Sequence, residues 1–378
     1  MRFRIPTKVV RSHYQDGRHH MLHAGTGQQQ TLDERFYQIL SAFRIASSCQ
    51  TAYQALGEAD FGFEQMQRAV DILVEQGWLE VEHPGAGFEP GRRGLFASPL
   101  LALEQVLADP SITDVVLGLA YDLGCSNRSG SRLAPDFLRL ASPQLFGRAG
   151  SDFDPVKGGR VLAGRRLADL GNLAGAVFQS NGECFERLAR VVELLLAQGR
   201  RPVLLGGDHS ITYAGLQGMM ARGPVQLVQF DAHSDYAGPV EGDWRDRLHH
   251  GNFVSWALEH ERLERVVQVG VRQLVSDDEQ HPRIVRFAGL SALDSDWLSC
   301  LSSSPIYLTI DVDCLEPSLF PSTGTPVPGG FTPRELVRLV EQLVRSSCPA
   351  VIDLVELLPD REVDALIACE VMLRALDS

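Results

Sequence analysis

Residues 225–235 read VQLVQFDAHSD, an apolar run that stops abruptly at three acidic or imidazole side chains. Two other segments have the same form, residues 202–210 (PVLLGGDHS) and residues 305–313 (PIYLTIDVD). A short apolar run that ends in polar residues is typical of a buried strand in a parallel sheet. The three segments therefore predict an α/β fold whose polar side chains gather at the carboxyl ends of central strands, where open α/β sheets bind ligands.

These strand ends supply two imidazoles and four carboxylates that can surround metal: His209, Asp231, His233, Asp235, Asp311 and Asp313. Residues two apart point to one side if strand geometry continues past residue 230, which would align the side chains within each segment. Crowded carboxylates repel one another and take up protons unless cations are present. An oxygen-rich ligand set suits Mn²⁺ better than Zn²⁺ or Cu²⁺. Two divalent ions can lower the pKa of a shared water molecule, which is equipment for hydrolysis.

The composition is that of an ordinary globular protein. The chain has 378 residues, of which 44% are hydrophobic and 22% are charged, enough for a large α/β domain and a small one. A net charge of −13 argues against general nucleic-acid binding, because phosphate contacts require a basic face. Seven scattered cysteines predict reduced thiols. No apolar run approaches the ~20 residues that cross a bilayer, so we expect a cytoplasmic enzyme.

Breaker residues and helical spacing divide the chain into three parts: an N-terminal domain over residues 1–83, a linker over residues 84–97 and a large domain over residues 98–378. The linker begins with PGAGFEPG, which is too rich in glycine and proline for regular structure. In the large domain, helices such as residues 179–198 alternate with strands. This alternation predicts a three-layer α/β/α architecture with a parallel sheet covered on both faces.

Further motifs accompany the strand ends in the large domain. They are GLAYD at residues 118–122, RSGSRLAP at 128–135, DLG at 169–171, GVR at 270–272, TGTP at 323–326 and DLVE at 353–356. Together with the three strand-end segments, they resemble the ureohydrolases, the family of arginase, agmatinase and formiminoglutamase, and they are closer to the agmatinase branch. The resemblance implies an arginase-like fold, two Mn²⁺ ions per chain, a guanidino-containing substrate and a homo-oligomer.

The resemblance also implies a role for each metal ligand: Asp231 and Asp311 would bridge the ions, His209 and Asp235 would hold one, and His233 and Asp313 would hold the other. Asp235 would in addition orient the attacking hydroxide. Asp208 would orient a ligand without contacting metal. Gly206 and Gly207 are expected to permit a tight turn rather than to bind phosphate.

Two further residues match catalytic and substrate-binding positions of that family. His250, in the sequence LHHG at residues 248–251, is the candidate general acid for the departing amine, with His249 as its competitor. Glu356 fits the carboxylate that binds the guanidinium group through two hydrogen bonds. The segment after Glu356 departs from the family pattern, and either Glu362 or Asp364 stands where an aspartate is expected.

The N-terminal domain resembles a winged-helix module. Apolar spacing predicts helices over residues 32–43, 49–56 and 63–76 and a short strand over residues 78–82. Residues 1–97 hold ten Lys or Arg and eleven Asp or Glu, which makes DNA binding the weaker interpretation. The arrangement also resembles the leader-peptide recognition modules of enzymes that modify ribosomally made peptides. A leader peptide is therefore a candidate partner, and a stabilising or oligomerising extension is the alternative.

The residues after the second metal segment bear on the substrate. Residues 236–240, YAGPV, lack the asparagine-like anchor with which arginases hold the α-carboxylate of arginine, and the following loop is acidic. We therefore expect a dimanganese amidinohydrolase that releases urea, with peptidyl arginine as one substrate that would give ornithine. Agmatine or a guanidino acid is an alternative, as is a formimino compound that would release formamide. A non-catalytic binding protein of the same fold is the alternative from a different class.

Overall fold

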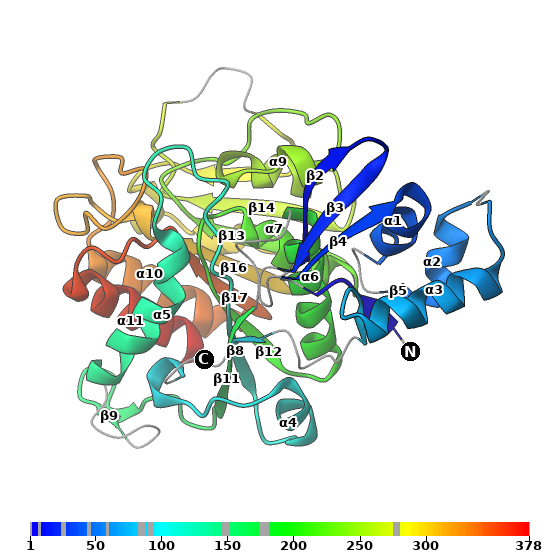
Figure 1. The fold of residues 1–378 in the computed structure, drawn as a ribbon. Coiled ribbons are helices and arrows are strands. Elements are labelled where there is room, and N and C mark those ends of the chain that lie inside the picture. Colours follow the sequence, from blue (N-terminus) through cyan, green and yellow to red (C-terminus); the bar gives the residue numbers. More distant parts are fainter. Residues whose placement is uncertain are drawn as a thin grey trace. The chain divides into compact units, whose positions relative to one another are not determined.

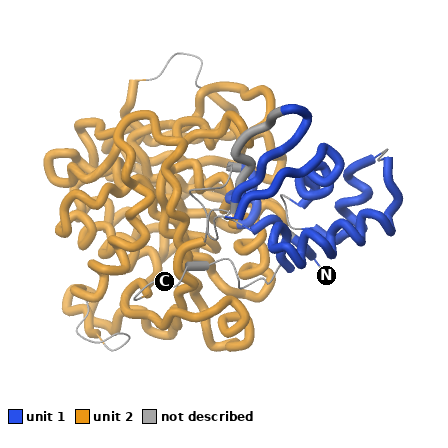
Figure 2. Tube along the Cα trace, in the orientation of Figure 1, with its two compact units in different colours: residues 1–87, 174–187 blue, residues 88–173, 188–378 orange. Residues whose placement is uncertain are grey.

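The computed structural model describes residues 2–6, 9–23, 28–43, 47–57, 60–81, 88–89, 94–145, 152–173, 181–274 and 280–377. Internal contacts divide the chain into two compact units (Figure 2). The smaller unit comprises residues 1–87 and 174–187, and the larger comprises residues 88–173 and 188–378. No described helix is both long and apolar enough to traverse a bilayer.

A large sheet forms the centre of the larger unit (Figure 1), in the order β15-β14-β13-β16-β17-β12-β8-β11-β7. The eight strands from β15 to β11 are parallel, and β7 pairs antiparallel with β11. The bounds are β7 Phe88–Glu89, β8 Asp114–Gly118, β11 Leu167–Leu173, β12 Arg201–Leu205, β13 Val225–Phe230, β14 Leu263–Val269, β15 Ile284–Phe287, β16 Ile306–Asp311 and β17 Val351–Val355. The residues of β8, β12, β13, β16 and β17 are all buried, as expected for central parallel strands.

Helices cover both faces of this sheet and confirm the predicted three-layer architecture. Figure 1 shows α5, α10 and α11 together on one side of the central strands and α7 with α9 on the other. The bounds are α4 Leu103–Ala108, α5 Ala134–Ala141, α6 Asn181–Ala197, α7 Ile211–Met220, α8 Trp244–Arg247, α9 Phe253–Leu258, α10 Pro333–Ser346 and α11 Glu362–Leu376. The side chains of Thr332 and Glu335 form a reciprocal capping box at the start of α10.

The order of the four central strands explains why distant segments meet. Strands β13, β16, β17 and β12 are consecutive neighbours and run parallel, so their carboxyl ends lie at one edge of the sheet. The segments beginning at residues 206, 231, 311 and 356 leave from these four ends. The three strand-end segments quoted above therefore converge at one edge, together with Glu356.

Gly206 and Gly207 are required because neighbouring groups lie against their backbone. A Cβ atom on Gly207 would fall 1.6 Å from the carbonyl oxygen of Tyr121, and one on Gly206 would fall 2.5 Å from a methyl carbon of Val355. Close packing of the chain, rather than the tight turn that was expected, therefore explains both glycines.

The segment predicted as a linker is partly ordered on the larger unit. Residues 88–89 form β7, and the short helix η1 (Leu95–Ala97) buries Leu95 and Phe96 in the main core. Residues 84–87 and 90–93 lie outside the described residues. The prediction of a linker up to residue 97 is thus wrong for residues 94–97, because two adjacent apolar side chains there pack into the sheet-and-helix core.

The smaller unit has a hydrophobic core of its own, which includes Phe43, Met66 and Trp78. Its elements are β1 Arg2–Arg4, β2 Val9–Gln15, β3 Arg18–His23, β4 Gln28–Asp33, α1 Glu34–Ser41, β5 Ser47–Ser48, α2 Cys49–Ala55, α3 Phe63–Glu75 and β6 Glu80–Val81. The three predicted helices are present. The first begins at Glu34 instead of Leu32, because the Asp33 side chain accepts a hydrogen bond from the Phe36 N–H and caps the helix.

The strands of the smaller unit differ from the prediction. The strand predicted over residues 78–82 is shorter in the structure, where β6 pairs antiparallel with β1 near the N-terminus. Strands β2, β3 and β4 form an antiparallel meander that was not predicted. The Asp16-Gly17 dipeptide was a usable signal, because both residues have positive φ (51° and 74°) and join β2 to β3 in a two-residue turn. The winged-helix assignment stays a prediction.

The close approach at Gly207 generates a prediction about stability. Replacing Gly207 with Ala should destabilise the protein by about 1–3 kcal/mol or more, because the new methyl group collides with backbone that cannot rotate away. Thermal unfolding of the metal-free protein measures the effect, and Gly159→Ala is the control, since nothing lies within 4 Å of its Cβ position. A Gly207→Ala protein that unfolds at the wild-type temperature would contradict the prediction.

Candidate metal centre and active site

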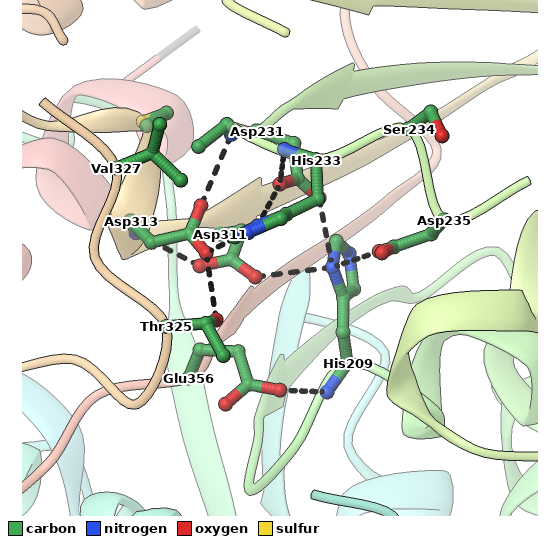
Figure 3. A network of polar contacts seen from close by, with 12 residues as sticks. His209, Asp231, His233, Ser234, Asp235, Asp311, Asp313, Thr325, Val327 and Glu356 are labelled. Carbon is green, nitrogen blue, oxygen red and sulfur yellow. Dashed lines mark hydrogen bonds and ion pairs between the residues drawn. The ribbon is translucent and has the colours of Figure 1, made fainter. Parts of the chain in front are cut away.

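Three carboxylates surround the His209 ring at the edge of the sheet (Figure 3). Its Nδ1 lies 3.0 Å from Asp231 Oδ2, 2.9 Å from Asp235 Oδ2 and 3.2 Å from Asp311 Oδ2. His209 follows β12, Asp231 and Asp235 follow β13, and Asp311 ends β16. The side chains of Asp231 and His209 are almost completely buried. Three separate segments thus bring one imidazole and three carboxylates together out of water.

His233 forms a second group beside the first. Its Nδ1 lies 2.8 Å from Asp313 Oδ2 and 3.5 Å from Asp231 Oδ1. Asp231 therefore faces both imidazoles, one through each carboxylate oxygen. Within the described part of the chain, two sets of side chains have the geometry to hold a metal ion, His209 with Asp231 and Asp235, and Asp231 with His233 and Asp313. The two sets share Asp231.

The surroundings of the His209 ring show whether the side chains of the cluster are suitable for binding a cation. Its Nδ1 atom is buried and makes no hydrogen bond, although three carboxylate oxygens lie within 3.2 Å of it. A ring nitrogen and carboxylate oxygens are all suitable metal ligands, and a cation among them would satisfy each one. The donor set of this cluster therefore fits a divalent metal ion.

The electrostatics of the cluster show how strongly its charges depend on one another. Burial alone would lower the pKa of His209, but its carboxylate neighbours raise that pKa well above the ordinary value. Burial likewise opposes protonation of His233, and Asp313 nevertheless raises the pKa of His233 to about 12. Burial and the charge of Asp231 raise the pKa of Asp235 to about 7. Without cations the cluster therefore retains protons that metal ions would displace.

The same type of hydrogen bond, from a backbone N–H to an Asp side chain, turns each acidic segment. Asp208, Asp231 and Asp311 each accept a hydrogen bond from the backbone N–H two residues later, at 3.1, 2.6 and 2.8 Å. Such turns are a known preference of aspartate. Strand geometry does not continue past residue 230, because β13 ends at Phe230. The side chains converge because the chain bends.

Asp235 and Glu356 have unusual backbone conformations. Both are non-glycine residues with positive φ, 47° and 64°. Such conformations cost on the order of 1–3 kcal/mol each and persist where the surroundings fix them. For Glu356 these include a hydrogen bond from its N–H to the Gly207 carbonyl at 2.9 Å. The two carboxylates predicted to act on the attacking water and on the guanidinium group are thus held by strained backbone.

Glu356 contacts both His209 and His250. Its Oε1 accepts the His209 backbone N–H at 2.8 Å and lies 3.0 Å from His250 Nδ1. The other ring nitrogen of His250 faces the backbone N–H of Ser126 at 3.1 Å, which can only donate. The neutral ring therefore carries its proton on Nδ1 and donates to Glu356. Burial would lower the pKa of His250, but Glu356 raises it above the ordinary value.

His249 lies differently from His250. Its Nδ1 accepts the N–H of Gly251 at 3.2 Å, so the side chain caps the short helix η5 (His250–Asn252). Burial and the charge of His250 lower the pKa of His249. Of the two adjacent histidines, His250 is the one that lines the cavity at the cluster.

Several supporting residues were not predicted from the sequence. Gln229 donates to Asp231 at 2.7 Å, Thr309 contacts His209 Nε2 at 2.8 Å, and Thr325 donates to Asp313 at 3.3 Å. Gln229 and Thr309 are fully buried within apolar strands. A polar residue in the middle of a buried strand was the signal that could have found both of them.

The structure also places the remaining residues singled out in the sequence. Asp208 accepts the Gly124 N–H at 2.8 Å, so it holds the loop after β8 instead of orienting a metal ligand directly. Asp364 is fully buried and accepts the Ser322 hydroxyl at 2.5 Å, whereas Glu362 begins α11 at the surface.

A cavity of about 270 Å³ opens onto the cluster. Its wall includes four residues of the cluster, His209, His233, Asp235 and Asp311. Five neutral polar residues line it as well, namely Ser126, Ser234, Tyr236, Gln273 and Thr325, together with the ring of His250. Among the described residues of this wall there is no Lys or Arg. The cavity is therefore suited to a cationic group and offers no cation to a carboxylate.

Comparison with known proteins agrees with this geometry. A sequence model of the arginase family matches residues 113–377. The chain is 32% identical over 282 residues to the mitochondrial guanidino acid hydrolase of Homo sapiens, covering 69% of this chain and 76% of that protein. It is 33% identical over 262 residues to an agmatinase of Blochmanniella floridana, covering 65% and 80%.

A solved structure extends the comparison to three dimensions. The crystal structure of a hypothetical agmatinase from Burkholderia thailandensis superposes with a TM-score of 0.62 at 30% identity, covering 71% of this chain and 86% of that chain. The family predicted from the sequence motifs is thus confirmed. This chain belongs to the arginase family of hydrolases.

Proposed function

We propose that this chain is a dimanganese amidinohydrolase that hydrolyses a guanidino group to an amine and urea. The observation that carries the proposal is the position of Asp231 between two imidazoles, with a carboxylate oxygen facing each ring. Asp311 would be a further ligand on the His209 side, since its Oδ2 lies 3.2 Å from His209 Nδ1. An oxygen-rich ligand set of this kind favours Mn²⁺ among the common divalent metals.

Three residues beside the cluster would perform the remaining steps. When bound, a pair of divalent ions makes a hydroxide nucleophile available near neutral pH. Asp235 would accept a hydrogen bond from the attacking water and orient it. Glu356 would accept two hydrogen bonds from the guanidinium group and hold its carbon near the nucleophile. His250, whose pKa Glu356 raises, would give a proton to the departing amine, which leaves only when protonated.

We propose arginine residues within a peptide as the substrate, giving ornithine residues. The wall of the cavity supports this choice, because among its described residues no cation could hold the α-carboxylate of free arginine. An arginine in a chain has no free α-carboxylate. The smaller unit, which has its own core, would bind the leader segment of such a peptide.

Small guanidines are the second candidate class of substrate, because the relatives named above are an agmatinase and a guanidino acid hydrolase. Agmatine carries an ammonium group and suits an acidic cavity, whereas a guanidino acid would bring a carboxylate to a wall whose described residues include no Lys or Arg. A formimino substrate would release formamide instead of urea. A non-catalytic role is disfavoured by the clustering of both imidazoles with their carboxylates.

The substrate proposal predicts a ranking in a urea-release assay. With Mn²⁺ present, an arginine-containing peptide should give a higher kcat/KM than free arginine or guanidinobutyrate, and an upstream leader segment should lower its KM. Agmatine and formiminoglutamate complete the panel, with formamide measured beside urea. A preference for free arginine would contradict the peptide assignment, and formamide as the sole product would contradict amidinohydrolysis.

The proposed role of His250 predicts a difference between adjacent histidines. His250→Asn should lower kcat by about 10²–10⁴-fold, the usual contribution of a general acid, and should change KM much less. His249→Asn is the matched control and should retain most of kcat, because His249 caps a helix outside the cavity wall. Steady-state kinetics at saturating Mn²⁺ measures both. An unchanged kcat in His250→Asn would remove His250 from the mechanism.

A further inference from the structure

A chain of buried polar side chains leads away from His209 on the side opposite the carboxylates. His209 Nε2 lies 2.8 Å from Thr309 Oγ1, which lies 3.3 Å from Thr212 Oγ1. The Thr212 hydroxyl donates to Asp353 Oδ2 at 2.7 Å, and the Tyr307 hydroxyl donates to the same oxygen at 2.7 Å. All five residues are at most 1% exposed. The proposed mechanism leaves Asp353 without a role.

Beyond His209, the side chains of this hydrogen-bonded series come from β16, β17 and α7. Thr309 and Asp353 are directly paired residues on the adjacent parallel strands β16 and β17, and Thr212 lies at the start of α7. Gly215, one turn along α7, leaves room for the Tyr307 ring, since a Cβ there would fall 2.1 Å from the phenol oxygen. The position of each hydroxyl group is therefore fixed by packing.

The direction of each hydrogen bond follows from counting protons. An ionised carboxylate can only accept, and a threonine hydroxyl has one proton to donate. Because Thr212 gives its proton to Asp353, its oxygen must accept from Thr309. Thr309 has then used its own proton, so its oxygen must accept from His209. The Nε2 atom of His209 therefore carries a proton, and in the neutral ring Nδ1 is left bare.

We propose that Asp353 is a positioning residue that fixes the tautomer of His209 through Thr212 and Thr309. Because the Asp353 carboxylate accepts at one end of this series of hydrogen bonds, the neutral His209 ring at the other end carries its proton on Nε2. Its Nδ1 atom then has a lone pair that can bind a cation. Nδ1 is the atom among the carboxylates of Asp231, Asp235 and Asp311. The inference rests on the proposed function, since a bare Nδ1 matters only if a cation binds there.

Substitutions of Thr212 can distinguish a hydrogen-bonding role of this residue from a role in packing alone. The Thr212 hydroxyl group bonds to Thr309 and Asp353, so it reaches the His209 ring only through Thr309. In Thr212→Val, the Thr309 hydroxyl group loses the Thr212 oxygen as an acceptor and can turn to donate to His209 Nε2, which would place the ring proton on Nδ1. Thr309→Val would instead leave the Nε2–H without an acceptor. Both variants should weaken the binding of the ion at His209 and leave the binding of the ion at His233 unchanged.

The test measures Mn²⁺ binding without substrate. Electron paramagnetic resonance of free Mn²⁺ during titration gives the number and affinity of bound ions, and the spectrum distinguishes coupled from single ions. Wild-type protein should bind two ions. Thr212→Val and Thr309→Val should each bind one of them about 10–100-fold more weakly, the usual effect of losing a residue that orients a ligand. Thr212→Ser and Thr309→Ser should restore binding.

Thr113→Val is the matched control. The Thr113 hydroxyl group also donates to a buried carboxylate, that of Asp114, but Asp114 lies at the amino end of β8, the edge of the sheet away from the cluster. The Thr113→Val protein should bind two ions with wild-type affinity. Two ions bound at wild-type affinity by folded Thr212→Val would overturn the inference while leaving the proposed function intact. Wild-type protein that binds no Mn²⁺ would instead contradict the proposed function. Thermal unfolding of each metal-free variant establishes that it is folded.

Discussion

Repulsion among buried carboxylates is the constraint on which the rest of this structure depends. Asp231, Asp235, Asp311 and Asp313 are buried at one edge of the sheet with two imidazoles among them. Like charges at such distances outside water cannot all remain ionised without cations. The parallel order of four central strands brings the carboxylates together, and tight packing at Gly207 holds the adjoining loops. The fold thus builds a site whose charge only metal ions or protons can balance.

The sequence predicted the parallel sheet and the residues that meet at its edge, because short apolar runs followed by Asp or His are distinctive. It did not predict how they meet. Strand alternation suggested that Asp231 and Asp235 share a face, whereas the chain bends after Phe230 and Asp235 adopts a positive φ. Hydrogen bonds to Asp side chains from the backbone N–H two residues later accompany that bend. They are a local preference of aspartate that strand alternation leaves out. The partners of His209 and His250, Thr309 and Ser126, likewise come from distant segments.

The structure of the smaller unit was also predicted only in part from the sequence. Its helices follow from amphipathic spacing, but the meander of β2, β3 and β4 has no strong alternation and was missed despite the Asp16-Gly17 turn. The larger unit contains the complete cluster and its cavity. Among the described residues, every candidate metal ligand therefore belongs to the larger unit.

The most direct test of the central claim is a crystal structure of the Mn²⁺-loaded protein with anomalous diffraction measured at the manganese absorption edge. Two anomalous peaks are expected, one beside His209 and Asp235 and one beside His233 and Asp313, with Asp231 between them. A single peak, or manganese bound away from these residues, would contradict the assignment of two ions to this site.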